Sequence, residues 1–231
     1  MKFISIIPAR GGSKGIPGKN IYPLFGKPLL GWTIEASLGS NFVHRTIVST
    51  DDPEIASVAL EFGAEVPILR PEELAEDDTP TMAVLQHVVQ YLAVHEEWIP
   101  DAVITLQPTS PLRTSEDIDQ AVQLFLSDPN ADSLVSCIEV PHIFHPTSVM
   151  ELNAEGYLKN FINGQQPTRR QDKAPVLARN GAAIYITRLN CIDKFVWGGK
   201  ALAYLMNAER SVDIDNIEDL KTAEKYLARR K

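Results

Sequence analysis

Short apolar runs rich in valine and isoleucine alternate along the chain with longer segments in which apolar residues recur at helical spacing. This alternation is typical of parallel β-strands connected by crossover helices. The predicted strands cover residues 3–7, 46–49, 66–69, 102–106, 133–138 and 182–186. The predicted helices cover residues 28–38, 53–62, 81–95, 115–126 and 216–229. We therefore expect an α/β sheet covered by helices, with ligands bound at the carboxyl ends of its strands.

One segment, residues 140–178, interrupts this alternation. It contains several prolines, asparagines such as Asn153 and Asn160, and few long apolar runs. A segment of this kind is poorly suited to bury a core of its own, so we expect an extended arm or small subdomain that packs against another chain. The chain as a whole, residues 1–231, is predicted to be a single domain into which this arm is inserted.

Composition and charge limit what the chain can do. With 231 residues, of which 44% are hydrophobic, it can bury a sizeable core. The formal net charge is −8 and no long basic stretch is present, so we expect no nucleic-acid partner. No apolar run approaches the roughly 20 residues that cross a bilayer, so we expect no membrane insertion. Cys137 and Cys191 lie far apart and the N-terminus has no signal-peptide pattern, which predicts a reduced, cytoplasmic protein.

The stretch PARGGSKGIPGKN, residues 8–20, directly follows the first predicted strand and contains four glycines and three cations. It is neither a Walker A loop nor a dinucleotide fingerprint. Other residues stand where those motifs require glycine: Ser13, Lys14 and Pro17. The glycines can bring backbone amides close to an anion, while Arg10, Lys14 and Lys19 add charge that suits a triphosphate. A flexible surface turn with solvated lysines is the alternative interpretation.

Two carboxylates, Asp213 and Asp215, are spaced two residues apart in SVDIDN, residues 211–216. If residues 211–214 are extended, both carboxylates project from one face. Such a face suits Mg²⁺, which takes a few hard oxygen ligands and fills its other positions with phosphates and water. The alternative is that Asp215 caps the helix predicted to follow at once.

Six motifs occur in a fixed order along the chain: ARGGSKGIPGKN, STDD, LRPEELAEDDTPT, LQPTSPLR, RRQD and SVDIDN. This set resembles the CMP-N-acetylneuraminate synthetases, or acylneuraminate cytidylyltransferases, and their relatives that act on other nonulosonic acids. The resemblance extends over nearly the whole chain and is weakest in residues 140–163. It implies a Rossmann-like, mostly parallel sheet with helices on both faces and an inserted dimerisation arm.

The resemblance also implies an activity. Members of the family transfer CMP from CTP to the anomeric hydroxyl of a sialic-acid-like, nine-carbon sugar acid, release pyrophosphate and use Mg²⁺. They are dimers in which the arm crosses to the partner's active site. On this basis we expect a nucleotidyltransferase that binds CTP and a nonulosonic acid and forms a homodimer.

The residues that match the family's functional positions fall into four groups. The catalytic group comprises Arg10, Lys14, Lys19 and Arg170. The nucleotide-binding group comprises Arg10, Asn20, Arg70, Thr79, Thr81 and Gln107, with Asn20 near the ribose. The sugar-binding group comprises Gln107, Arg170 and Tyr185. The metal-binding group is Asp213 and Asp215.

The arginine pair in RRQD is the candidate partner for the sugar's carboxylate. An arginine grips a carboxylate through two parallel hydrogen bonds, which favours a functional role for Arg170. Without the resemblance, Arg169 and Arg170 would be read as a solvated loop pair.

Three departures from the family pattern lie where the family contacts the sugar. Thr147 follows His145 and Pro146 where sialate members often carry a lysine shortly afterwards, NGAAIYI has one extra alanine, and paired phenylalanines are missing near Phe195. The sequence therefore favours N-acetylneuraminate no more than legionaminate, pseudaminate or another deoxy sugar acid as the acceptor. Two alternative functions remain: a cytidylyltransferase for 3-deoxy-manno-octulosonate, and a nucleotide-binding regulatory protein without turnover.

Overall fold

A computed structural model of the protein describes residues 1–162, 169, 173–181 and 183–229. A seven-stranded sheet with the order β11-β6-β10-β5-β1-β4 forms its centre, and β9 pairs with β6 outside this path. The strands are β1 (Phe3–Pro8), β4 (Val43–Ser49), β5 (Ala102–Thr105), β6 (Ser133–Glu139), β9 (Leu177–Arg179), β10 (Tyr185–Arg188) and β11 (Ala201–Leu205). Strand β10 is antiparallel to both neighbours and β9 is antiparallel to β6, whereas the other five strands share one direction. The predicted mostly parallel α/β sheet is confirmed.

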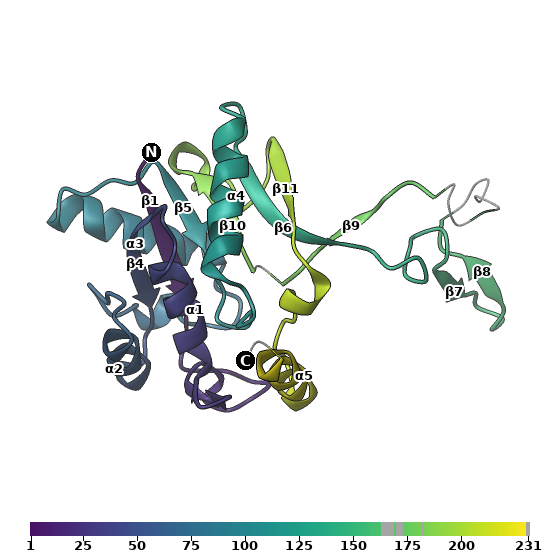
Figure 1. The fold of residues 1–231 in the computed structure, drawn as a ribbon, viewed down its shortest axis with the longest axis horizontal. Helices are drawn as coiled ribbons and strands as arrows, with labels where there is room; N and C mark the ends of the chain where they lie inside the picture. Colours follow the sequence, from purple (N-terminus) through teal and green to yellow (C-terminus); the bar gives the residue numbers. More distant parts are fainter. Residues whose placement is uncertain (163–168, 170–172, 182, 230–231) are drawn as a thin grey trace.

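Helices cover both faces of this sheet (Figure 1). The α-helices of the described chain are α1 (Leu29–Leu38), α2 (Pro53–Glu61), α3 (Thr81–His95), α4 (Ser115–Ser127) and α5 (Ile217–Ala228). The alternation along β1 explains the layering, because Phe3 and Ile7 pack in the cluster that contains α1 and α4 residues, while Ile4 and Ile6 pack in the cluster that contains α3 residues. A third cluster joins α5 to the start of α1.

Smaller elements complete the described chain. Two short hairpins pair β2 (Pro23–Leu24) with β3 (Lys27–Pro28), and β7 (Met150–Leu152) with β8 (Leu158–Asn160). Single 3₁₀ turns are η1 (Lys19–Ile21), η2 (Glu72–Leu74), η4 (Leu189–Cys191) and η5 (Ala208–Arg210). In the part of the chain that the structure describes, no helix combines the length and apolar character needed to cross a membrane.

The predicted helices agree with the structure to within a residue at each end, but the predicted strand at 66–69 is wrong. Only Glu65 forms a bridge, to Ile47 of β4. Pro67 follows two residues later, and because proline has no amide hydrogen to donate, it cannot continue the ladder. The last predicted strand begins at Tyr185 rather than at 182, which lies outside the described residues.

Residues 140–162 and 173–178 leave the main body as an extended arm that carries the β7–β8 hairpin (Figure 1). Its apolar side chains are unusually exposed. Six of them are each more than half accessible to solvent: Ile143, Phe144, Leu152, Tyr157, Leu158 and Phe161. Exposed apolar patches of this kind mark interaction surfaces.

Candidate functional site

The glycine-rich loop, residues 9–20, follows β1 at the carboxyl edge of the sheet and is held there by hydrogen bonds between its backbone and the side chains of Asn20 and Asp51. Asn20 is buried, and its side-chain amide donates to the Arg10 carbonyl oxygen at 2.8 Å. The Gly11 amide donates to Asp51 Oδ1 at 3.0 Å, and a Cβ on Gly11 would lie 2.8 Å from Asp52 Oδ2. The STDD motif at the end of β4 thus supports the loop. Asn20 holds the loop's shape, and its predicted place near a ribose stays a prediction.

The three cations of the loop point to two different partners. Arg10 Nη2 lies 2.7 Å from Asp77 Oδ1, and Lys14 Nζ pairs with the other oxygen of the same carboxylate. These contacts, that of Lys14 first, lower the pKa of Asp77. Lys19 Nζ instead donates to the Ile214 carbonyl at 2.9 Å and lies 3.5 Å from Asp215 Oδ1. The loop therefore connects Asp77, in the segment after η2, with the segment that carries the two candidate metal ligands, Asp213 and Asp215.

A pocket of about 240 Å³ opens beside this loop. Five of the six residues predicted to bind the nucleotide line it: Arg10, Arg70, Thr79, Thr81 and Gln107. They come from the loop after β1, the segment around η2, the first turn of α3 and the end of β5. The structure thus brings together residues that are almost 100 positions apart in the sequence.

Arg70 is a buried cation in the wall of this pocket. Its Nε donates to Ser49 Oγ at 3.2 Å, and its Nη2 donates to the Ser49 carbonyl. Burial lowers the pKa of Arg70 to about 10, Asp51 opposes this shift and Arg10 adds to it. The guanidinium stays protonated at neutral pH, so the pocket keeps a fixed positive charge.

A second pocket, of about 460 Å³, adjoins the first and shares Thr81 and Gln107 with it. Tyr185, predicted to contact the sugar, lines its wall together with Arg179 and the aromatic rings of Phe195 and Trp197. The Arg179 guanidinium lies over the Trp197 ring, 4.7 Å from its centroid. Burial raises the pKa of Tyr185, and the Arg179 charge opposes that rise.

Two arginines are candidates for binding the sugar's carboxylate: Arg179, which the sequence analysis missed, and Arg170, whose predicted role stays a prediction. Arg179 was missed, although its place directly before the Asn180–Gly181 pair was a usable signal. Arg170 of the RRQD motif lies outside the described residues, and its neighbour Arg169 is exposed.

Asp213 and Asp215 lie in a segment to which the structure assigns no strand, and Asp215 does not cap the following helix. Asn216 is the cap. Its side-chain oxygen accepts hydrogen bonds from the backbone amides of Glu218 and Asp219, and the Asp219 carboxylate accepts one from the backbone amide of Asn216. The alternative interpretation of Asp215 as a helix cap is therefore wrong. Its carboxylate is exposed and faces the glycine-rich loop through Lys19.

Asp213 is more enclosed than its neighbour. Its Oδ1 is buried and has no hydrogen-bond partner in the described part of the chain. Burial raises the pKa of this carboxyl; the nearby Thr109 hydroxyl opposes the rise without closing a bond of normal geometry, and Asp215 adds to it. A buried carboxylate oxygen without a donor is a fitting ligand for a cation.

No group of three or more histidine, cysteine, aspartate or glutamate side chains with metal-ligand geometry occurs among the described residues. A pair of carboxylates still fits Mg²⁺, which is commonly held by one or two carboxylates together with substrate phosphates. His145, in the arm, bonds the Thr147 hydroxyl and the Ala174 carbonyl.

Comparison with known proteins places these observations in a family. A family model described as cytidylyltransferase matches residues 4–228. The chain is 34% identical to an N-acylneuraminate cytidylyltransferase of Escherichia coli, covering 96% of this chain and 51% of that protein. It is 32% identical to a pseudaminic acid cytidylyltransferase of Campylobacter jejuni, covering 96% and 95%. It is 34% identical to a CMP-N,N'-diacetyllegionaminic acid synthase of Legionella pneumophila, covering 98% and 97%.

The chain thus spans about half the length of the first of these relatives and nearly the full length of the other two. Among solved structures, it is similar to a CMP:2-keto-3-deoxy-manno-octonic acid synthetase complexed with CTP. The TM-score is 0.74 at 20% identity, and all of both chains is covered. At that identity the likeness concerns the fold.

Proposed function

The chain belongs to the cytidylyltransferase family, and from that premise we propose that it transfers CMP from CTP to the anomeric hydroxyl of a nonulosonic acid. The observation that carries this proposal is the pair of adjoining pockets. One is lined by five residues of the predicted nucleotide set, the other by Tyr185 and Arg179, and Gln107 and Thr81 belong to both. Two substrates bound in these pockets would meet at the shared wall.

The first pocket would hold the cytidine, and the loop cations would hold the triphosphate. Arg70 supplies fixed charge in the pocket wall, while Arg10, Lys14 and Lys19 lie along the loop that borders it. Positively charged donors fixed before the substrate arrives stabilise the charge that builds up on phosphate oxygens without reorganisation. These residues therefore act by positioning and by electrostatic stabilisation.

The second pocket would hold the sugar acid. Arg179 is the cation on its described wall and can bind a carboxylate, while the rings of Phe195 and Trp197 provide an apolar surface for acyl groups. Arg170 remains a second proposed partner of the carboxylate. The anomeric oxygen would attack the α-phosphorus, the bond to the bridging oxygen would break, and pyrophosphate would leave as the hydroxyl proton is lost.

Asp213 and Asp215 would hold the Mg²⁺ that this reaction is proposed to use. The partnerless buried oxygen of Asp213 and the exposed carboxylate of Asp215, adjacent to the triphosphate loop, support this assignment. Bound there, Mg²⁺ would supply charge neutralisation on the triphosphate oxygens. The protein's own contribution is to hold the Asp213 carboxyl in a partly buried position, where a bound cation would favour its ionised form against the effect of burial.

We further propose a homodimer that works in the cytoplasm. The exposed apolar side chains of the arm support association, since a second copy would remove them from water. Both cysteines, Cys137 and Cys191, are buried and unpaired, which suits a reducing compartment. Fractionation of cells that express the protein tests the compartment, and recovery in a membrane or secreted fraction would contradict it.

The activity is tested by pyrophosphate release from CTP and Mg²⁺ with a panel of sugar acids. We expect release with N-acetylneuraminate, legionaminate or pseudaminate, because the three named relatives act on acids of this kind. Release with 3-deoxy-manno-octulosonate alone would favour the rival enzyme. No release with any acceptor, despite measurable CTP binding, would favour a regulatory nucleotide-binding protein.

A further inference from the structure

Asp77 occupies the two cations that are proposed to receive the triphosphate. One oxygen of its carboxylate lies 2.7 Å from Arg10 Nη2 and the other pairs with Lys14 Nζ. Arg10 Nη1 also donates to the Ala75 carbonyl at 3.4 Å. The segment after η2, residues 75–79, is thus bound to the glycine-rich loop through Arg10 and Lys14.

This contact lies at the entrance of the nucleotide pocket. Asp77 and Glu76 line the 240 Å³ pocket, and they also line a neighbouring hollow of about 540 Å³ between the glycine-rich loop and the segment after η2. Arg10 borders both spaces and Lys14 borders the second. A triphosphate that extends from the pocket toward Lys14 would have to cross the position of the Asp77 carboxylate.

A carboxylate and a phosphate group offer the same chemistry to these cations, because each presents paired anionic oxygens. Arg10 and Lys14 cannot direct the same hydrogens to both. Glu76 and Asp78 flank Asp77 in the sequence and add negative charge, so a triphosphate next to an unmoved Asp77 would meet repulsion. The two anions therefore compete for one pair of cations.

We propose that Asp77 is a built-in anion that holds Arg10 and Lys14 in place in the free enzyme and is displaced by the triphosphate of CTP. The inference rests on the proposed function, since it takes CTP to be the ligand. Displacement would release the segment that carries Thr79, another residue of the pocket wall. Arrival of the triphosphate would in this way be coupled to the shape of the nucleotide pocket.

The test compares ligand binding to wild type, Asp77→Asn and Asp78→Asn by calorimetry at low ionic strength. Asp78→Asn is the matched control, because it removes the same charge one residue away and the described part of the chain gives Asp78 no ion-pair partner. The ligands are CTP, cytidine and inorganic tripolyphosphate. Asp77→Glu, which keeps the carboxylate, is the rescue variant.

We expect Asp77→Asn to bind CTP and tripolyphosphate about threefold to tenfold more tightly than wild type, as the loss of two competing exposed ion pairs predicts. Cytidine binding should change by less than about twofold, because cytidine carries no phosphate that would compete with the Asp77 carboxylate for these cations. Asp78→Asn should change CTP binding by less than about twofold, and Asp77→Glu should resemble wild type. Added salt should reduce the advantage of Asp77→Asn, because it screens all of these charges.

Three outcomes would overturn the inference: equal tripolyphosphate binding by wild type and Asp77→Asn, weaker tripolyphosphate binding by Asp77→Asn, or an equal gain in Asp78→Asn. Tripolyphosphate separates this inference from the proposed function. If it binds Asp77→Asn more tightly while no variant binds CTP, the competing role of Asp77 stands and the proposed cytidylyltransferase function fails.

Discussion

Gly181 lies directly against the carboxylate of Asp213. A Cβ at position 181 would be 2.2 Å from Asp213 Oδ2 and 2.4 Å from its carboxyl carbon, and the glycine has a φ of +71°. Both the close approach and the backbone conformation require glycine here. Because Gly181 also lines the second pocket, it places a candidate metal ligand next to the proposed sugar site.

Substitution of this glycine should displace Asp213 and reduce turnover. We expect Gly181→Ala to lower kcat at least about tenfold and to raise the Mg²⁺ concentration that gives half-maximal rate, since the metal would lose a positioned ligand. Gly156→Ala is the control: that glycine has a φ of +86° and nothing within 4 Å of its Cβ position, so it carries the strain of about 1 to 2 kcal/mol without the contact. Equal rates for the two variants would contradict the prediction.

The raised pKa of Asp213 predicts opposite effects on stability and activity. Burial favours the protonated carboxyl in the folded state. Its contribution to stability is therefore full below the unfolded pKa, about 3.9, and is lost as the pH rises through the higher folded pKa. Asp213→Asn, which never ionises, should unfold at higher urea concentration than wild type at pH 7, and this advantage should shrink toward pH 4.

The measurement uses metal-free protein in EDTA, so that metal binding does not add to stability. In the same variant, turnover at saturating Mg²⁺ should fall about 100-fold, as expected when a charge that acts on the transition state is lost. A variant that keeps wild-type turnover would rule out the metal role of Asp213. A stability difference that does not vary with pH would rule out its buried ionisation.

The sequence predicted those parts of the fold that depend on local patterns. Helix α3 follows directly from apolar residues at helical spacing, and β1 from an apolar run that is buried on both faces. Strand β11 was missed because its alternating alanines, Ala201 and Ala203, give little apolar contrast. The failure at 66–69 has a different origin: the apolar composition favours a strand, but Pro67 has no amide hydrogen to donate to a β-ladder.

The site was predictable where motifs supplied the residues, but its contacts were not. Five residues of the 240 Å³ pocket were named from motifs, yet nothing in the sequence told which loop cation would meet which acid. Lys19 pairs with Asp215 and Arg10 with Asp77 because the loop bends between them, a result of tertiary packing. For Arg179, the sequence offered its place before Asn180 and Gly181, but its contact with the Trp197 ring arises only in the folded chain.

Arg113 is a buried structural support of the site. Its Nη2 donates to Thr33 Oγ1 at 2.8 Å, and its Nη1 donates to the Ala183 carbonyl and, at 3.4 Å, to that of Gln107. Burial lowers the pKa of Arg113 to about 9, against the charge of Asp117. One guanidinium thus connects α1, the segment before β10 and a residue of both pockets.

Arg113→Lys should be costly, because an ammonium group cannot reproduce the planar fork of donors. We expect a loss of about 2 to 4 kcal/mol in the free energy of unfolding by urea and a rise in the KM for CTP through Gln107. Arg229→Lys is the control, since the Arg229 side chain is 70% exposed, and it should change stability by less than about 0.5 kcal/mol. Similar values for the two variants would contradict a supporting role for Arg113.

The exposed arm predicts that a charged substitution will separate the proposed dimer. Leu158→Asp should convert the protein to a monomer in size-exclusion chromatography with light scattering, while circular dichroism shows a folded main body. The control is Leu60→Asp on α2, because Leu60 is 58% and Leu158 65% exposed. Leu60 lies on α2 and not among the exposed apolar side chains of the arm, so we expect Leu60→Asp to keep the oligomeric state of wild type. A monomeric wild type would refute the dimer itself.

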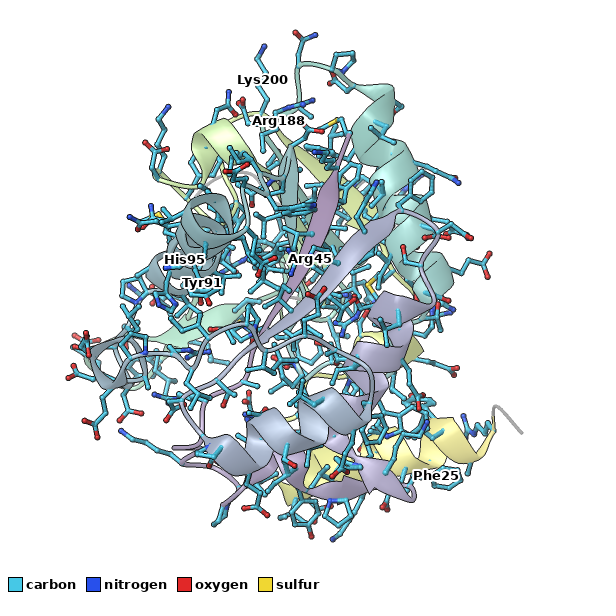
Figure 2. The ribbon with its side chains drawn as sticks, turned by 90° about the vertical axis from the view of Figure 1, so that its left-hand side faces the viewer. Phe25, Arg45, Tyr91, His95, Arg188 and Lys200 are labelled. Atoms are coloured by element: carbon cyan, nitrogen blue, oxygen red, sulfur yellow. The ribbon has the colours of Figure 1, made fainter. Side chains whose placement is uncertain are left out.

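Arg179 should discriminate between the two substrates. In Arg179→Lys the charge stays, but the planar stack on Trp197 and the two parallel donors are lost. We expect the KM for the sugar acid to rise about tenfold and the KM for CTP to change less than about twofold. Arg45→Lys is a matched control, because Arg45, labelled in Figure 2, makes a similar contact over Trp98, at 5.3 Å. In the β1–β4 ladder, Arg45 lies opposite Ile4, near the start of β1. Pro8, at the other end of β1, lines the 240 Å³ pocket, so Arg45 lies away from this pocket and neither KM should change in this variant. Equal rises in both KM values for Arg179→Lys would indicate general damage to the site instead of sugar recognition.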